Sequence, residues 1–221
     1  MRQRSSASVL ALVSGGCDSA IMVAWLARRF RSVHPVYVRF GLAWEGAELA
    51  GLRRFLRAAR IPGASRLTVL SLPVRDTYGK HWSVTGHRAP GARSNDRLMY
   101  LPGRNLLLLS RAAVLAALRR VPVIALGTLK GNLFADASAR YRRGFGLVAS
   151  MAMSRHLTVI APFGGKRKRD VLRLGRALPL HLTFSCISPV RGRQCGRCNK
   201  CAERRRGFAD AGLPDHTRYA H

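Results

Sequence analysis

Five short segments rich in β-branched residues recur along this chain, and each is almost continuously apolar. Strands of this composition are buried on both faces, as in a parallel sheet covered by helices. Helical patterns separate the segments, and such alternation predicts an α/β fold. The expected strands are 8–13, 34–40, 66–73, 121–128 and 157–162, and the expected helices are 18–30, 44–60, 105–120 and 139–153.

The first segment runs directly into the residues Ser-Gly-Gly-Cys-Asp-Ser, where a helix is expected to start. No lysine follows the glycines, which excludes the Gly-Lys-Ser/Thr phosphate loop, and the glycine spacing differs from the dinucleotide fingerprint. A turn at Ser14, Gly15 and Gly16 aims N–H groups and hydroxyls at a phosphate above the helix N-terminus. Ser19 can add a hydroxyl there, and Asp18 can hold Mg²⁺ against the phosphates. The alternative is a plain glycine turn in which Asp18 caps the helix.

Four of the five cysteines lie near the C-terminus with the spacing C-x8-C-x2-C-x2-C. Four thiolates at Cys186, Cys195, Cys198 and Cys201 fit a closed, structural zinc site. An iron–sulfur cluster also accepts four thiolates, and unliganded or disulfide-bonded cysteines are the remaining alternative. A metal would hold together a C-terminal segment too short and too basic to bury a core alone. The fifth cysteine, Cys17, is interpreted as structural.

The formal net charge of +29 raises the question of nucleic-acid binding, because clustered basic residues release counterions from phosphate backbones. Only five of the 39 basic residues are lysines, and the arginines are scattered over nearly every segment. Arginine enrichment is also what a GC-rich genome produces without selection for binding. Direct nucleic-acid binding is therefore not expected, although the charge leaves it open.

The N-terminal stretch is basic and then apolar, as a signal peptide is, but it continues into the glycine pair instead of a cleavage site. No uninterrupted apolar run approaches the roughly 18 residues of a membrane-spanning helix. We therefore interpret the stretch as a first strand and expect a cytoplasmic protein without membrane contact.

Residues 74–104 show no clear period and are rich in Gly, His and Arg. Long segments of this kind either cover a functional site or form an irregular connection, and both possibilities stay open.

The motif Ser14-Gly15-Gly16-Cys17-Asp18-Ser19 matches the SGGxDS loop of the N-type ATP pyrophosphatases, the PP-loop superfamily. With the C-terminal cysteines, the chain resembles the QueC/ExsB-like family of 7-cyano-7-deazaguanine synthases over about residues 8–217. Further matches are Pro102-Gly103-Arg104-Asn105, Gly131-Asn132 with Asp136, Pro162-Phe163, Lys168, and Thr183 near Ser185-Cys186. The resemblance implies a Rossmann-like (adenine nucleotide alpha hydrolase-like) parallel sheet with helices on both faces. It also implies a zinc-binding helical segment over 181–221, packed on an ATP-binding domain over 1–180, and a homodimer.

The chemistry implied by the resemblance begins with ATP, Mg²⁺ and the carboxylate of 7-carboxy-7-deazaguanine. Adenylation supplies a leaving group, ammonia displaces AMP to give an amide, and a second activation dehydrates the amide to a nitrile. The expected catalytic residues are Asp18, Arg104 and Lys168, which neutralise phosphate charge or hold Mg²⁺. The expected ATP-binding residues are Ser14, Gly15, Gly16, Asp18 and Ser19, and the expected substrate-binding residues are Phe40, Gly41, Arg104, Asn105, Asn132 and Asp136.

Two loops depart from the family pattern. Phe40-Gly41-Leu42 replaces the usual Tyr-Gly-Gln, and residues 134–138 keep only Asp136 of the usual Tyr-Pro-Asp-Cys-Arg. Each missing hydrogen bond to a buried ligand costs on the order of 1–3 kcal/mol unless another residue replaces it. Candidates for replacement are His81, Trp82, His87 and Tyr100. A homologue that amidates or adenylates a different carboxylate, and a tRNA-modifying PP-loop enzyme, are therefore alternative functions.

Overall fold

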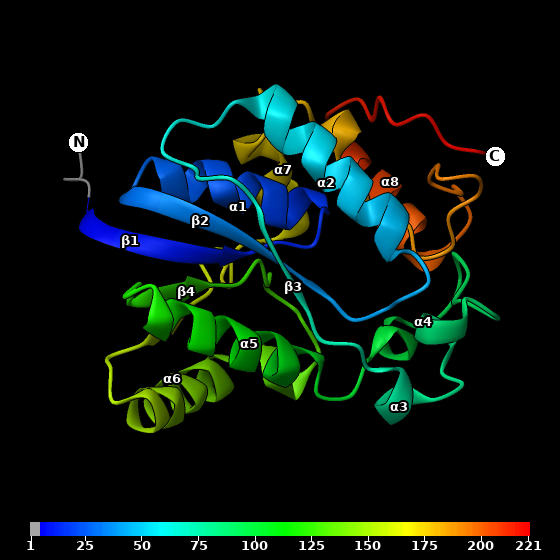
Figure 1. The fold of residues 1–221 in the computed structure, drawn as a ribbon. Helices are drawn as coiled ribbons and strands as arrows, with labels where there is room; N and C mark the ends of the chain where they lie inside the picture. The colour runs from blue at the N-terminus through cyan, green and yellow to red at the C-terminus, as the bar shows by residue number, and fades with distance from the viewer. Residues whose placement is uncertain (1–4) are drawn as a thin grey trace.

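The computed structural model describes residues 5–221, and it contains one five-stranded parallel sheet (Figure 1). The strand order is β3-β2-β1-β4-β5, so the chain moves outward to one edge and then returns past β1 to build the other. The predicted parallel sheet is confirmed. Its strands are β1 (Ser5–Leu12), β2 (Phe30–Arg39), β3 (Thr68–Ser71), β4 (Val123–Ala125) and β5 (Thr158–Ile160).

Helices cover both faces of the sheet, as the alternation predicts (Figure 1). The side chains of β1 alternate between the faces, since successive residues of a strand point in opposite directions. Val9 and Ala11 pack in the cluster with α1, α2, α7 and α8, whereas Leu10 and Leu12 pack in the cluster with α5 and α6. The helices are α1 (Cys17–Ala27), α2 (Glu45–Ala59), α5 (Arg104–Leu118), α6 (Ala139–Met153), α7 (Lys168–Leu174) and α8 (Asn199–Ala211).

Several boundaries differ from the expected ones. β2 begins at Phe30, four residues before the expected start, because the chain enters the strand soon after α1 ends at Ala27. β4 and β5 have three residues each, although longer apolar segments predicted longer strands. Leu126 follows β4 directly, is buried in the core and still donates its N–H to Ile160 O at 2.9 Å, so burial and a pairing contact continue past the end of the strand.

The stretch without a period contains three single helical turns, namely α3 (Arg75–Tyr78), α4 (Trp82–Thr85) and the 3₁₀ turn Asp96–Met99. Turns of four residues are too short to produce a periodic pattern, which is why the sequence did not predict them. Contacts with the C-terminal segment anchor the stretch: Asn199 N donates to Pro90 O at 3.0 Å, and Asn199 Nδ2 donates to Asp96 Oδ1 at 3.0 Å. Further 3₁₀ turns lie at Ala135–Ala137 and Leu180–Leu182.

The helical stretch Asp96–Leu118 is long and apolar enough to cross a membrane by length and composition alone. Arg97, Arg104 and Arg111 interrupt this stretch, so it is not an uninterrupted apolar run. Leu109, Ala112, Ala113 and Ala116 of α5 are buried against the sheet, so these residues belong to the α/β core.

Candidate functional site

A cleft of about 580 Å³ lies at the carboxyl ends of the strands, where ligands bind in open parallel sheets. Segments far apart in the sequence form its walls. The expected site residues on these walls are Ser14, Gly16, Asp18, Ser19, Phe40, Arg104, Asn105, Asn132, Asp136 and Lys168. Gly15 and Gly41 lie next to wall residues in the chain without lining the cleft themselves.

The glycine loop has a backbone that accepts few other residues. Gly15 has φ +80°, and a Cβ there would lie 3.0 Å from both Cγ and the backbone O of Glu48. Ser19 closes the loop, because its Oγ donates to Gly16 O at 3.0 Å and accepts from Ser14 N at 3.2 Å. Gly16 is the N-cap of α1 and makes no side-chain cap, so N–H groups of the first turn are available to an anion.

Replacing Gly15 with Ala is expected to lower the free energy of unfolding by about 1–3 kcal/mol, the cost of a left-handed backbone in a residue with a side chain. Gly16→Ala is the matched control, since Gly16 has φ −71° and its Cβ would meet no atom closer than 3.7 Å. The control should change stability by less than about 1 kcal/mol, because the smaller entropy of the unfolded chain offsets the poorer capping by alanine. Urea unfolding of both variants measures the difference, and equal stability would contradict the strain assigned to Gly15.

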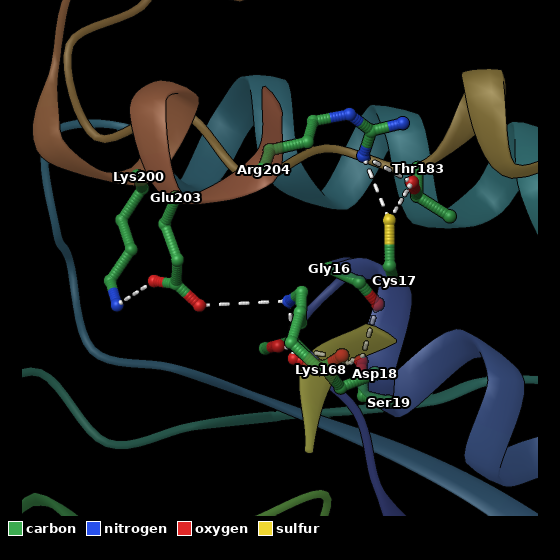
Figure 2. A network of polar contacts seen from close by, with 10 residues as sticks. Gly16, Cys17, Asp18, Ser19, Lys168, Thr183, Lys200, Glu203 and Arg204 are labelled. Atoms are coloured by element: carbon green, nitrogen blue, oxygen red, sulfur yellow. Dashed lines mark hydrogen bonds and ion pairs between the residues drawn. The ribbon is translucent and has the colours of Figure 1, made fainter. Parts of the chain in front are cut away.

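Asp18 stands at the start of α1 and forms an ion pair with Lys168 of α7. Lys168 Nζ lies 2.6 Å from Asp18 Oδ2 and 3.6 Å from Glu203 Oε1, and Lys200 Nζ lies 2.6 Å from Glu203 Oε2 (Figure 2). Burial opposes the charged form of Lys168, but the carboxylates of Asp18 and Glu203 outweigh it and raise the pKa of Lys168. Burial likewise opposes the charged form of Glu203, but Lys168 and Lys200 lower the pKa of Glu203 to about 2. Asp18 Oδ1 is buried and has no hydrogen-bond partner within residues 5–221. A carboxylate oxygen of this kind suits Mg²⁺.

Arg104 begins α5 on another wall of the cleft, after Gly103 turns the chain with φ +70°. Arg104 Nε is buried and lacks a partner in the described chain, as expected of a group that meets an anionic ligand. Asn105 is not the N-cap, because Gly103 occupies that position. The carboxylate of Asp136 instead accepts from Asn105 N at 3.0 Å and from Asn105 Nδ2 at 3.2 Å, and so holds the start of α5.

The wall expected to meet the substrate ring is aromatic. Trp44 and Trp82 are stacked with ring centroids 5.7 Å apart, and Tyr100 and Phe134 lie 5.1 Å apart, all four lining the cleft. Two of the candidate replacements, Trp82 and Tyr100, therefore lie at the site. The other two do not line it: His81 instead accepts from Ser83 N at the start of α4.

Two glutamates in the first turn of α2 were not singled out by the sequence. Glu45 accepts from Phe40 N and, at 2.9 Å, from Gly41 N, so it fixes the loop after β2. Glu48 accepts from Tyr37 Oη at 2.6 Å. Acidic residues are common in the first turn of a helix, where they complement its dipole, so their sequence position gave no signal of a role in the cleft.

The four C-terminal cysteines lie together, with all four sulfur atoms within 4.8 Å of one another. All four are buried and free of disulfide bonds. Backbone N–H groups point at the sulfurs, including Cys195 N to Cys186 Sγ at 3.2 Å and Cys198 N to Cys195 Sγ at 3.3 Å. Four sulfur atoms at this spacing form a donor set that suits a tetrahedral metal ion.

Arg204 links the cysteine cluster to the glycine loop. It lies on α8 one turn after Cys201, has 1% of its surface exposed, and donates to Cys17 Sγ at 2.9 Å and to Thr183 Oγ1 at 2.7 Å (Figure 2). The thiol of Cys17 thus takes part in a buried structural contact. A backbone hydrogen bond from Phe184 N to Gly15 O, 2.9 Å long, makes a second link.

A parallel sheet with an SGGxDS loop between β1 and α1, opening onto a cleft at the strand ends, defines a protein of the PP-loop superfamily. The model of the family described as "Queuosine biosynthesis protein QueC" matches residues 8–212. The chain belongs to this family.

Relatives of known name are similar to the chain over nearly its whole length. The 7-cyano-7-deazaguanine synthase of Anaeromyxobacter sp. (strain Fw109-5) is 32% identical to this chain, over 99% of each protein. The enzyme of that name from Myxococcus xanthus (strain DK1622) is also 32% identical, over 94% of this chain and 95% of its own length. Among solved structures, a predicted tRNA methyltransferase subunit from Methanocaldococcus jannaschii is similar with a TM-score of 0.49 and 17% identity, covering 76% of this chain and 73% of its own.

Proposed function

We propose that this protein is an ATP-dependent ligase that forms a C–N bond, converting 7-carboxy-7-deazaguanine and ammonia into 7-cyano-7-deazaguanine. The observation that carries the proposal is the convergence of the glycine loop, Asp18, Lys168 and Arg104 on one cleft. A chain 32% identical over 99% of its length to a 7-cyano-7-deazaguanine synthase supports the choice of substrate.

The ATP half of the reaction follows from the chemistry of these groups. Ser14, Gly15, Gly16 and Ser19 would hold the β- and γ-phosphates at the start of α1. The free oxygen of Asp18 would hold Mg²⁺, which neutralises phosphate charge when bound. Lys168 would place a fixed positive charge beside the phosphates, and Arg104 would face the charge that develops as the substrate carboxylate attacks the α-phosphate.

Replacing Asp18 with Asn should lower turnover at least about tenfold, since a loss of about 1.4 kcal/mol of transition-state stabilisation suffices. The wild-type protein should convert ATP into AMP and pyrophosphate, because the glycine loop would bind the β- and γ-phosphates. Chromatography of the nucleotides measures both expectations. Asp210→Asn removes an equal charge from an exposed position and should leave turnover unchanged. Products consisting of ADP and phosphate would refute the proposed bond cleavage.

The substrate half rests on Phe40, Gly41, Asn105, Asn132 and Asp136 with Arg104, and here one alternative is favoured by a specific observation. Phe40 and Leu42 are apolar where the family has hydrogen-bonding residues, which suits an enzyme that activates a different carboxylate. A tRNA-modifying PP-loop enzyme is a further alternative.

Expression in a bacterium that lacks its own synthase separates these functions. The proposed activity should restore queuosine to the tRNA of that strain. A soluble, metal-loaded protein that restores none would favour the different carboxylate. An assay of AMP release over a panel of carboxylic acids would then identify the acid.

We also propose that the four cysteines bind one structural zinc ion, since a set of four thiolates leaves no open coordination position. Elemental analysis tests the identity of the metal, and a finding of iron would refute zinc.

We further propose a cytoplasmic homodimer. Exposed apolar side chains on α5 and α6 support the dimer, including Leu118 (78% exposed) and Met151 (72% exposed). Light scattering during size-exclusion chromatography tests the dimer, and a monomeric mass would refute it. Direct nucleic-acid binding is not part of the proposal.

A further inference from the structure

The proposed reaction needs a proton acceptor for its nitrogen nucleophile. Near neutral pH ammonia exists mainly as ammonium, whose nitrogen has no free electron pair until it loses a proton. Amide formation releases another proton from the same nitrogen, and nitrile formation releases the two that remain. A group that accepts protons in the cleft, close to the reacting carbonyl, would therefore serve every step on the nitrogen.

The described residues that line the cleft include six carboxylates and no histidine. Five of the carboxylates accept from cationic groups or N–H donors, which bind the charged form of a carboxylate. Asp18 and Glu203 pair with lysines, and Glu45, Asp96 and Asp136 accept from N–H groups of the backbone or of asparagine.

Glu48 also accepts hydrogen bonds, from Tyr37 and Trp44, but no lysine or arginine forms an ion pair with it among the described residues, and its burial outweighs these bonds. It lies in the first turn of α2 with 8% of its surface exposed, packed behind the glycine loop, where its Cγ would be 3.0 Å from a Cβ on Gly15. Glu48 Oε2 accepts a short hydrogen bond, 2.6 Å long, from Tyr37 Oη. Burial, and to a smaller extent the charge of Glu45, raises the pKa of Glu48 to about 7. The hydrogen bonds from Tyr37 and Trp44 and the charge of Arg104 lower this pKa, but burial outweighs them. Among these neighbours Arg104 is also the group expected to meet the substrate.

We propose that Glu48 is the proton acceptor for the nitrogen nucleophile, placed between the glycine loop and Arg104 where the adenylated carboxyl group forms. The inference rests on the proposed function and adds a catalytic residue to it. Tyr37 is then a positioning residue, which fixes the carboxylate through its Oε2. Burial and the charge of Glu48 raise the pKa of Tyr37, so its hydroxyl keeps the proton that it donates.

Each proton and electron pair has a destination in this scheme. Ammonium gives a proton to the Glu48 carboxylate, and the resulting ammonia forms a C–N bond to the acyl carbon. Glu48 passes this proton to water. The C–O bond to AMP breaks and its electron pair leaves with AMP, and Glu48 then accepts the surplus proton from the nitrogen. The amide oxygen then takes a second AMP group from ATP with loss of pyrophosphate. Removal of the two remaining N–H protons and departure of AMP give C≡N.

Glu48→Gln tests the proposal with two nucleophiles. With ammonia at pH 7 the rate should fall about 100-fold, the usual contribution of a general base. Hydroxylamine is mostly uncharged at pH 7 and skips the first proton transfer, and the surplus proton of its adduct is acidic enough to pass to water, so hydroxamate formation from the same acid and ATP should stay within about threefold of wild type. Asp76→Asn removes an equal charge from an exposed position outside the cleft and should match wild type with both nucleophiles.

The pH profile gives a readout that a merely structural role would not change. The wild-type rate with total ammonia should rise with pH to a plateau above about pH 7, whereas the Glu48→Gln rate should keep rising towards the pKa of ammonium itself. Tyr37→Phe removes a donor to the charged carboxylate and should move the wild-type rise to higher pH. Because Tyr37→Phe keeps Glu48, it decides the matter even if Glu48→Gln does not fold.

The outcomes separate the two proposals. A wild-type protein that forms neither nitrile nor hydroxamate overturns the proposed function and this inference with it. An active wild type with an equally active Glu48→Gln variant, or a variant that loses both nucleophiles alike, overturns the inference alone. An unshifted profile for Tyr37→Phe also overturns it.

Discussion

Removing the metal from the four-cysteine site is expected to release residues 183–201 from the domain and to weaken ATP binding at least about tenfold. Structural zinc sites contribute about 10–16 kcal/mol of binding free energy, which is comparable to the whole stability of an ordinary domain. The segment joins the glycine loop through Phe184 N and Gly15 O, so its release removes a support of the phosphate site. Cys201→Ser should have the same effect, because it leaves three ligands.

Cys17→Ser is the matched control for this prediction. Cys17 lies outside the cluster, and a serine hydroxyl can still accept a hydrogen bond from Arg204. The control should therefore keep one metal ion per chain, whereas Cys201→Ser should not. Elemental analysis and calorimetric titration with ATP measure the two effects. Full ATP affinity in a metal-free Cys201→Ser protein would contradict the proposed coupling.

The fold was predictable because its signal is local. Apolar segments separated by amphipathic helices repeat along the chain, and a sheet buried on both faces needs both. The ends of β4 and β5 were not predictable, since Leu126 just beyond β4 is apolar and buried like the residues of the strand. The single turns between residues 74 and 104 escaped prediction because four residues give no periodic pattern, and the contacts of Pro90 and Asp96 are with Asn199, which is distant in the sequence.

The site was predictable where a contiguous motif carries it. The glycine loop and the four cysteines each form a pattern within a short stretch, and the structure brings the members of each together. Glu48, Glu203 and Arg204 gave no such signal, because each acquires its role from residues distant in the sequence. Glu203 follows Lys200 by three residues, which is the spacing of an ordinary helix-surface pair, yet Glu203 also meets Lys168 beside Asp18.

Arg204 illustrates this most clearly, and replacing it with Met is expected to lower the free energy of unfolding by about 3–5 kcal/mol. That is the usual cost of removing one partner from a buried ion pair. Arg204 Nε lies 3.3 Å from Asp215 Oδ1, and its Nη2 donates to Leu180 O at 2.8 Å in addition to the bonds to Cys17 and Thr183. Methionine fills much of the space but satisfies none of these acceptors.

The pH dependence of this loss has a definite sign. Burial alone would raise the pKa of Asp215, but the Arg204 guanidinium outweighs burial and lowers it. A carboxylate with a lowered pKa in the folded state contributes stability above its unfolded pKa and loses it as the pH falls through the folded value. The difference between wild type and Arg204→Met should therefore be full at neutral pH and shrink on acidification below the ordinary range of an aspartate.

Arg206→Met is the matched control, because Arg206 is exposed on the same helix. It should change stability by no more than about 0.5 kcal/mol at any pH. Urea unfolding at neutral and acidic pH measures all three proteins. If Arg204→Met costs no more than Arg206→Met, the hydrogen bonds of Arg204 contribute little to holding the C-terminal segment against the glycine loop, and the bonds of Phe184 and Thr183 are enough to do so.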